Sequence, residues 1–330
     1  DANVGAQTKQ FLENSFGKLR PLQQWTYDNQ AKNIVLTAQT GSGKTEAALF
    51  WLGNSKGFIT LPLRVSINDM YRRIQKEDGI GFESTGLLHS GALDFLVGTM
   101  ESDESTFGLY SESIKKASLL SYKLTLSTID QIFKFPLLYQ GFERELATLA
   151  YSKVVIDEIQ AYNPHIVAIL IKGLEMITEL GGKWMIMTAT LPAIFKEALQ
   201  KRGLLNGQSV EKIILLPDDT SKQYEVPRRH HIRLVQDSIL NEVDIILEYG
   251  ERKKVLVVVN TIQQSMQLYD LLRKETENVN LLHSQFIARD RQAKETNIKK
   301  FAQLNDVRSG IWVTTQVVEA SLDVDFDYLF

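Results

Sequence analysis

The feature that most restricts the fold of this chain is a short glycine-rich segment between a predicted strand and a predicted helix. Residues 38–45 read Ala-Gln-Thr-Gly-Ser-Gly-Lys-Thr, after the apolar run Ile34–Leu36 and before the helix-forming stretch Glu46–Leu52. Glycines let successive backbone N–H groups face inward, and the start of the next helix adds partial positive charge. The segment predicts a phosphate-binding loop, although alanine replaces its usual first glycine. Its candidate nucleotide-binding residues are Thr40, Gly41, Ser42, Gly43, Lys44 and Thr45.

Two of these residues have predicted roles in holding a nucleotide. Lys44 is expected to reach the β- and γ-phosphates, and the Thr45 hydroxyl is expected to bind Mg²⁺. A glycine-containing surface turn is the simpler interpretation of such a segment. The strand before it and the helix after it favour the phosphate loop.

The rest of the chain alternates short β-branched runs with longer amphipathic stretches, which is typical of βαβ units and a buried parallel sheet. We predict an α/β fold with two domains, residues 1–215 and 236–330, joined by a connector at 216–235 that is rich in Pro, Asp and charged residues. The first domain is expected to hold about five strands and the second three or four. The predicted strands are Asn33–Ala38, Gly57–Leu61, Lys123–Ser127, Lys153–Asp157, Lys183–Thr188, Val255–Asn260, Asn280–Ser284 and Ile311–Thr315.

Composition excludes several classes of protein. The 37 Lys and Arg residues against 40 Asp and Glu residues leave a net charge of −3, which argues against general coating of nucleic acid but allows a narrow basic groove. The absence of cysteine excludes disulfides, a thiolate nucleophile and zinc sites built on sulfur. No apolar run approaches the roughly 18 residues that a membrane span requires. We therefore expect no membrane partner and a cytoplasmic location.

A second chemical signal is a pair of acids at the end of the predicted strand Lys153–Asp157. Ligands bind at the carboxyl ends of strands in α/β sheets, and Asp157 and Glu158 stand there. Asp157 is suited to bind Mg²⁺, and Glu158 to orient or deprotonate an attacking water. Such a pair alone is more often a helix N-cap with a solvated neighbour. Its place downstream of a phosphate loop favours the catalytic interpretation.

Further motifs, in the order in which they occur, resemble those of the superfamily 2 helicases across nearly the whole chain. Phe16 and Gln23 resemble the aromatic residue and the glutamine that recognise adenine. The segment Thr188-Ala189-Thr190 resembles the motif that couples hydrolysis to movement. Residues 315–323 resemble a motif of the second domain in which Asp323 faces the nucleotide. This resemblance implies two RecA-like parallel-sheet domains in tandem, with ATP and Mg²⁺ as cofactors.

Three segments narrow the resemblance to the helicase component of type I CRISPR interference: Ser127–Gln131, Leu282–Phe286 and Val318–Asp325. In that family an RNA-guided surveillance complex recruits an enzyme that translocates on single-stranded DNA, and a histidine-aspartate (HD) nuclease, fused or separate, degrades the strand. The resemblance implies an ATP-dependent helicase with those partners in a prokaryotic cytoplasm. Its second motif usually ends in histidine, where this chain has Gln160, a candidate catalytic residue whose coupling role is open.

Residues that follow successive strands are candidates for holding a nucleic-acid strand through phosphate or sugar contacts rather than base reading. These candidates are Arg64, Ser127, Thr128, Asp130, Ser284 and Thr314. Taken singly, Ser and Thr at strand ends more often cap a helix or close a turn, and their collective placement carries the expectation. His89 and His283, each after an apolar pair and before serine, are interpreted as structural.

Two absences qualify the resemblance. No histidine is followed by aspartate, so we expect no HD nuclease in these residues. No Gln-x-x-Gly-Arg segment is present, so the second domain is expected to be incomplete at its C-terminal end and turnover to be weak, because an arginine finger can contribute roughly 10³ to 10⁵ in rate. The first residue, Asp1 rather than Met, also suggests a fragment or a processed chain.

Two other functions stay open at this point. One is a general superfamily 2 DNA-repair or RNA helicase, although the pair Ala320-Ser321 replaces the Arg-Gly of the common RNA-helicase branch. The other is a nucleotide-gated subunit that binds nucleic acid without turnover.

Overall fold

The computed structural model describes residues 3–38, 41–76, 79–98, 104–205, 209–214, 231–303, 305–318 and 324–330. The chain divides into two compact units, Asp1–Pro227 and Arg228–Phe330. Within the described residues each unit contains one parallel β-sheet with helices packed against it, which confirms the predicted α/β fold class. No helix in those ranges is long and apolar enough to cross a membrane.

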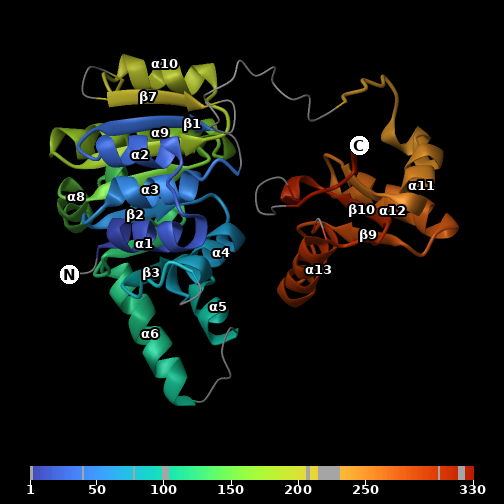
Figure 1. The fold of residues 1–330 in the computed structure, drawn as a ribbon, viewed down its shortest axis with the longest axis horizontal. Coiled ribbons are helices and arrows are strands. Elements are labelled where there is room, and N and C mark those ends of the chain that lie inside the picture. Colours follow the sequence, from blue (N-terminus) through green and yellow to red (C-terminus); the bar gives the residue numbers. More distant parts are fainter. Residues whose placement is uncertain are drawn as a thin grey trace. The chain divides into compact units, whose positions relative to one another are not determined.

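The sheet of the first unit has seven described strands in the order β3-β4-β2-β5-β6-β1-β7 (Figure 1). Five of them match predicted strands to within one residue. The expected number of about five is therefore wrong, and β3 and β7 are the additions. The strands are β1 (Asn33–Ala38), β2 (Gly57–Thr60), β3 (Thr85–Leu88), β4 (Leu124–Ser127), β5 (Lys153–Asp157), β6 (Lys183–Thr188) and β7 (Ser209–Ile214).

The two missed strands lie at the edges of this sheet, where the sequence signal for a strand is weakest. β3 has only four residues and includes Gly86, where an added Cβ would lie 2.4 Å from the Tyr122 ring. Glycine is depleted in strands, yet here its missing side chain makes room for an aromatic ring. β7 contains the charged pair Glu211 and Lys212, which interrupts its apolar run.

Both faces of this sheet are buried, because alternate residues of each strand enter different cores. In β1, Ile34 and Leu36 enter one core and Val35 enters the other. Helices α1 to α5 pack on the first side, and α7 to α10 pack on the second. The helices of the unit are α1 (Val4–Phe16), α2 (Pro21–Asp28), α3 (Lys44–Leu52), α4 (Arg64–Gln75), α5 (Ala92–Gly98), α6 (Glu104–Ser118), α7 (Ile129–Ile132), α8 (Phe142–Ala150), α9 (Pro164–Glu179) and α10 (Ala193–Lys201).

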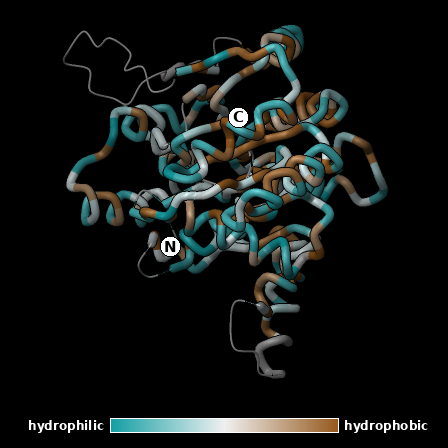
Figure 2. Tube along the Cα trace, turned by 90° about the vertical axis from the view of Figure 1, so that its right-hand side faces the viewer, coloured by the Kyte–Doolittle hydropathy of each residue, from teal (hydrophilic) through white to brown (hydrophobic). Residues whose placement is uncertain are grey.

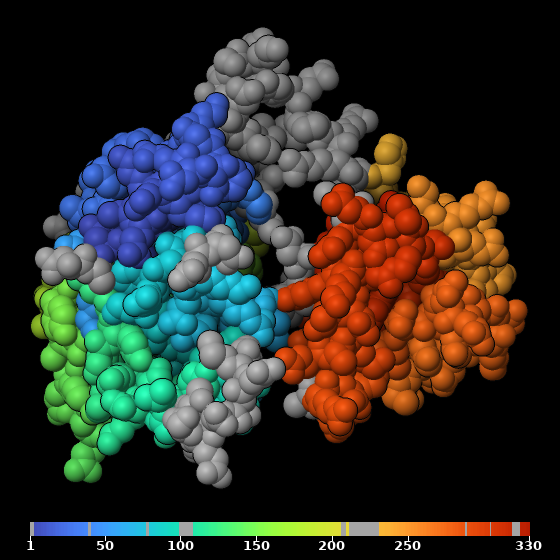
Figure 3. All heavy atoms as spheres, turned by 60° about the horizontal axis from the view of Figure 1, so that its bottom comes forward, coloured from blue at the N-terminus to red at the C-terminus, as the bar shows by residue number. Residues whose placement is uncertain are grey.

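The pictures agree with this division into core and surface. In Figure 2, brown (hydrophobic) stretches alternate with teal (hydrophilic) ones along the chain. On the face shown in Figure 3, the N-terminal helices (blue) adjoin the segment that contains α4 and α5 (cyan). Residues of these helices and of β1 share one hydrophobic core.

The second unit has four described strands in the order β11-β8-β10-β9, all parallel. Three of them begin one residue before the predicted strands, and β11 was not predicted. α11 and α12 share one core of the sheet, and α13 packs in the other. Its elements are α11 (Val243–Arg252), β8 (Lys254–Val258), α12 (Ile262–Glu275), β9 (Val279–Leu282), α13 (Ala288–Phe301), β10 (Gly310–Thr314) and β11 (Tyr328–Leu329).

Candidate nucleotide-binding site

The glycine-rich loop lies between β1 and α3, as the sequence predicts. Gly41 and Gly43 have φ angles of 79° and 88°, in the left-handed region that favours glycine. An added Cβ at Gly43 would lie 3.0 Å from Nε2 of Gln23, a tight contact, so the backbone conformation favours glycine and the space is narrow as well. The hydroxyl of Ser42 is buried and has no hydrogen-bond partner among the described residues. A buried hydroxyl without a partner is expected where a loop is shaped to bind a polar ligand.

Two residues of the segment before β1 hold this loop. The Arg20 guanidinium donates to the carbonyl of Gly41 (2.7 Å), and the Gln23 side chain accepts from the backbone N–H of Arg20 (2.8 Å). Gln23 is buried, whereas the ring of Phe16 is 68% exposed and free for a flat ligand to stack on. Arg20 is not among the site residues predicted from the sequence. Its place three residues before Gln23, as in a capping box, is the signal that could have identified it.

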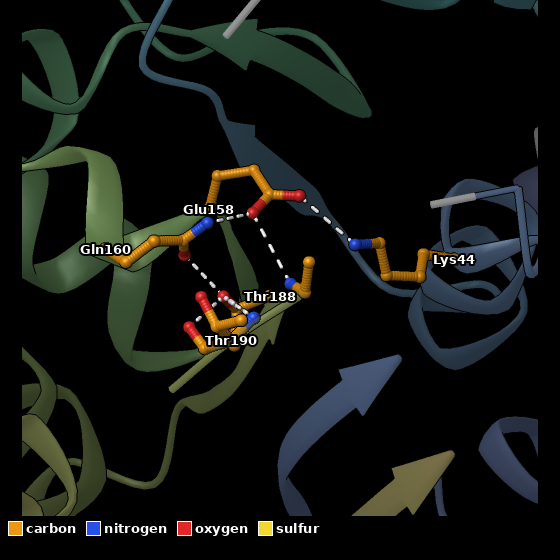
Figure 4. A network of polar contacts seen from close by, with 6 residues as sticks. Lys44, Glu158, Gln160, Thr188 and Thr190 are labelled. Atoms are coloured by element: carbon orange, nitrogen blue, oxygen red, sulfur yellow. Dashed lines mark hydrogen bonds and ion pairs between the residues drawn. The ribbon is translucent and has the colours of Figure 1, made fainter. Parts of the chain in front are cut away.

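Lys44 and Glu158 meet although they lie 114 positions apart in the sequence, because β1 and β5 flank the same neighbour, β6. The Lys44 ammonium lies 3.1 Å from Oε1 of Glu158 (Figure 4). Glu158 has a φ of 51°, a left-handed conformation that is uncommon outside glycine and that sets the direction of its side chain. Thr45 is half-buried in the first turn of α3.

Glu158 is also linked to the strand that follows it in the sheet. Its Oε2 accepts from the Gln160 side chain and from the backbone N–H of Ala189 (3.4 Å). Gln160 in turn accepts from the Thr188 hydroxyl, which itself accepts from the N–H of Thr190 (3.1 Å). Figure 4 shows this continuous path from Lys44 to the end of β6. Gln160 thus bridges the predicted catalytic acid and the predicted coupling segment.

Asp157 is the most perturbed acid of the site. Burial, with a smaller contribution from the charge of Glu158, raises the pKa of Asp157 to about 7, and Lys44 opposes this rise. Its Oδ1 atom is buried without a hydrogen-bond partner in the described chain. A buried carboxylate oxygen with no partner suits a hard divalent cation, which would compensate its charge. The Asp157 carboxylate therefore fits Mg²⁺, and the Thr45 hydroxyl, in the first turn of α3, is the other oxygen that the sequence predicts for the ion.

Four of the predicted strand-binding residues lie at or near the surface of their units. Arg64 is the first residue of α4 and is exposed. Thr128 is half-buried and Asp130 is exposed, both just after β4. Ser284 is exposed just after β9 in the second unit.

The other two are buried at strand ends. Ser127 and Thr314 have no measurable exposure. The Thr314 hydroxyl donates to the carbonyl of Val257 (3.4 Å), so it is used within the sheet. Neither hydroxyl is therefore accessible to a bound strand in this conformation. Two predicted nucleotide-binding residues, Thr40 and Asp323, lie outside the described residues.

Family comparisons cover most of the chain. Residues 20–198 match the family described as DEAD/DEAH box helicase. Residues 251–330 match the family described as CRISPR-associated nuclease/helicase Cas3, C-terminal. The chain is 32% identical over 309 residues to a CRISPR-associated nuclease/helicase Cas3 of Methanothermobacter thermautotrophicus, covering 90% of this chain and 36% of that protein. It is 28% identical over 345 residues to the Escherichia coli endonuclease/helicase Cas3, covering 89% and 38%. The chain thus spans well under half of these relatives.

Solved structures show the same fold. A structure of T. fusca Cas3 with ATP has a TM-score of 0.76 at 23% identity, over 96% of this chain and 42% of that one. A CRISPR RNA-guided surveillance complex in a pre-nicking state has a TM-score of 0.65 at 20% identity, over 97% and 41%. The DUF1998 helicase MrfA bound to DNA and AMPPNP has a TM-score of 0.62 at 16% identity, over 96% and 44%.

Proposed function

The chain belongs to the DEAD/DEAH box helicase family, and from that premise we propose that it is the ATP-driven motor of a CRISPR-associated helicase-nuclease. In this proposal it moves along single-stranded DNA while an HD nuclease, in another domain or subunit, degrades the strand. The observation that carries the proposal is the 3.1 Å contact between Lys44 of the glycine loop and Glu158 of the acidic pair. This contact supports the proposal, because a phosphate-binding cation and a candidate general base acting on one γ-phosphate must lie close together.

ATP hydrolysis would begin with a change in the partners of Lys44 and Glu158. When a triphosphate enters the loop, the Lys44 ammonium leaves Glu158 and contacts the β- and γ-phosphates. Glu158 is then free to accept a proton from the attacking water, and Gln160 and the N–H of Ala189 hold it in place. Mg²⁺ bound by Thr45 and Asp157 would neutralise the negative charge that builds up on the phosphates.

The path from Gln160 to Thr188 and Thr190 supports a coupling role for this network. A change in the hydrogen bonds of Glu158 during hydrolysis reaches the end of β6 through two side chains, without any movement of the sheet. The segment after β6 can therefore respond to whether a γ-phosphate is present.

Strand contacts and partners complete the proposal. On the first unit, phosphates or sugars of the strand would be held by Arg64, Thr128 and Asp130. On the second unit, Ser284 would hold them. The buried residues Ser127 and Thr314 would support these contacts from within their sheets. We place the two domains at 1–215 and 236–330 and the connector at 216–235, with Asp323 facing the nucleotide from the second domain. The names of the relatives support recruitment by an RNA-guided surveillance complex in a prokaryotic cytoplasm.

Nucleotide binding and turnover, measured separately, test this function. We expect a fluorescent ATP analogue to bind this chain, and single-stranded DNA to stimulate phosphate release once the chain is extended through a Gln-x-x-Gly-Arg motif. Glu158→Gln should retain the nucleotide and lose turnover by at least about 100-fold. Glu179→Gln, an exposed carboxylate at the end of α9, is the matched control and should change neither quantity.

Other outcomes distinguish the competing functions. A wild type that binds no adenine nucleotide at millimolar concentration contradicts the proposal. Binding without turnover, even with DNA, favours a nucleotide-gated binding subunit. Stronger stimulation by RNA than by DNA favours a general superfamily 2 RNA helicase.

A further inference from the structure

Five neighbouring strands of the first sheet each begin at a lysine or directly after one. The strands are β4, β2, β5, β6 and β1, which are consecutive in the sheet. Because neighbouring strands lie about 4.8 Å apart, their starts span about 19 Å. All five strands are parallel, so their starts lie at the edge of the sheet opposite to the nucleotide site. The lysines, which we call the lysine row, are Lys123, Lys56, Lys153, Lys183 and Lys32 in that order.

Hydrogen bonds within the first unit fix the positions of these lysines. The backbone N–H of Lys153 donates to the carbonyl of Lys56 on the neighbouring strand (2.9 Å). The buried Trp51 links two other members, because its indole N–H donates to the carbonyl of Lys32 (3.1 Å) and its own carbonyl accepts from the Lys153 ammonium. The sheet itself therefore sets the spacing of the lysine row.

The positive charge of the lysine row is not compensated within the described residues. None of its members forms an ion pair with a carboxylate of the described chain. The helices that lead into two of the strands end in an acid, Asp28 of α2 and Glu179 of α9, and Asp28 already accepts from Gln24 (2.9 Å). The turns themselves, residues 29–32, 53–56, 119–123, 150–153 and 180–183, contain no Asp or Glu. This edge thus has an excess of positive charge in a chain whose net charge is −3.

Two members of the row have structural roles. The Lys56 ammonium donates to the carbonyl of Tyr122 (2.6 Å), and the Lys153 ammonium to that of Trp51. Burial, with a smaller contribution from the charge of Lys123, lowers the pKa of Lys56, and burial lowers the pKa of Lys153 to about 8. A bound anion would relieve the repulsion between Lys56 and Lys123.

The other three members are available to a ligand. Lys32 is exposed, Lys123 and Lys183 are half-buried, and their ammonium groups donate to no atom of the described chain. An aromatic side chain stands among them, because Tyr151 lies two residues before the start of β5, the middle strand of the five, and is 69% exposed. A line of cations with an exposed ring suits the phosphates and a base of an unpaired nucleic-acid strand. An acidic protein surface would match the charge but gives no role to the ring.

We propose that the lysine row and Tyr151 form a second binding surface for single-stranded nucleic acid, separate from the strand-binding residues at the carboxyl ends of the strands. Binding there is independent of sequence, because lysine contacts phosphate as a point charge and tyrosine stacks on any base. The inference goes beyond the proposed function, since neither the ATP site nor the predicted strand contacts take part. An opened duplex has two unpaired strands, and this surface gives the chain a second place to hold one.

A dye attached beside the lysine row measures binding there separately from binding at the motor site. Because the chain has no cysteine, Asn54→Cys, in the exposed turn before β2, can be labelled with a single environment-sensitive dye. Titration with a short oligothymidylate at low salt, without nucleotide, should change its fluorescence. The triple variant Lys32→Gln, Lys123→Gln, Lys183→Gln should bind more weakly, and its slope of log binding constant against log salt should be smaller by about 2, since each phosphate contact contributes about 0.7. Lys274→Gln, an exposed lysine at the end of α12, is the control and should leave binding unchanged.

Variants of Tyr151 test the contribution of the ring. Tyr151→Ala should weaken the binding that the dye reports by about fivefold or more, as expected for the loss of one stacked base. Tyr151→Phe keeps the ring and should bind as the wild type does. All these variants should bind a fluorescent ATP analogue normally, because the substituted side chains lie at the edge of the sheet away from the nucleotide site.

Several outcomes would overturn this inference. They are a dye that does not respond to oligothymidylate, a Tyr151→Ala variant that binds as the wild type does, and polyglutamate or a duplex that binds as tightly as oligothymidylate at the same salt. The proposed function fails separately. A chain that shows the dye response but has no turnover after extension loses only its motor role, and a chain with DNA-stimulated turnover but no dye response loses only the second surface.

Discussion

Replacing Asp157 by asparagine should stabilise the nucleotide-free protein while removing its response to Mg²⁺. The carboxyl group is buried, and one of its oxygens has no hydrogen-bond partner among the described residues. Asparagine has nearly the same shape and carries no charge. The variant therefore removes the cost of burying an ionised group and keeps the packing.

The magnitude follows from the pKa. The pKa of Asp157 is about 7 in the folded chain, against about 3.9 for an unperturbed aspartate. Between these values the folded state binds more protons than the unfolded state, so the free energy of unfolding falls as pH rises. By this linkage the ionised Asp157 costs about 4 kcal/mol at pH 8 and roughly 1 to 2 kcal/mol at pH 5. Since the amide must also be solvated, we expect Asp157→Asn to gain about 2 to 4 kcal/mol at pH 8.

Urea unfolding followed by tryptophan fluorescence at pH 5 and pH 8 measures both effects, because Trp51 and Trp184 are fully buried in the same unit. The gain should be smaller at pH 5 than at pH 8. Saturating MgATP should stabilise the wild type by about 3 kcal/mol at 100 times its Kd and the variant by much less. Asp94→Asn, an exposed aspartate on α5, should change stability by no more than about 0.5 kcal/mol. A variant less stable than the wild type at pH 8, or a gain equal at both pH values, would refute the reasoning.

Two further predictions concern the polar network and the core. Gln160→Ala removes the link between the proposed catalytic carboxylate, Glu158, and the end of β6. Steady-state assays should show turnover lowered about 10- to 100-fold with nucleotide affinity unchanged, and an equal loss of turnover and affinity would contradict this prediction. Gly173→Ala places a Cβ 2.7 Å from the Phe133 ring, so urea unfolding should report a loss of about 1 to 3 kcal/mol. Gly108→Ala, where nothing lies within 4 Å, is its helical control and should gain up to about 1 kcal/mol.

Strands buried on both faces were predictable from the sequence because their apolar runs are continuous. β1, β5 and β6 begin and end where the sequence predicts, since each has neighbours on both sides and a core on both faces. β3 and β7 were missed because an edge strand needs less apolar character and admits Gly86 or the pair Glu211 and Lys212. The predicted identity, a helicase of the CRISPR-associated kind, is confirmed by the family comparisons.

The candidate site also has features that adjacent residues decide and features that depend on which strands are neighbours. The sequence alone determined the phosphate loop and the acidic pair, because glycine conformations and the direction of a strand end depend on residues that are adjacent in the chain. Only the tertiary structure decided that Gln160 bridges Glu158 and Thr188, that Ser127 and Thr314 are buried, and that the lysine row lies along one edge of the first sheet. Those relations depend on which strands are neighbours, and strand order is set by packing energy summed over the whole sheet rather than by any single segment.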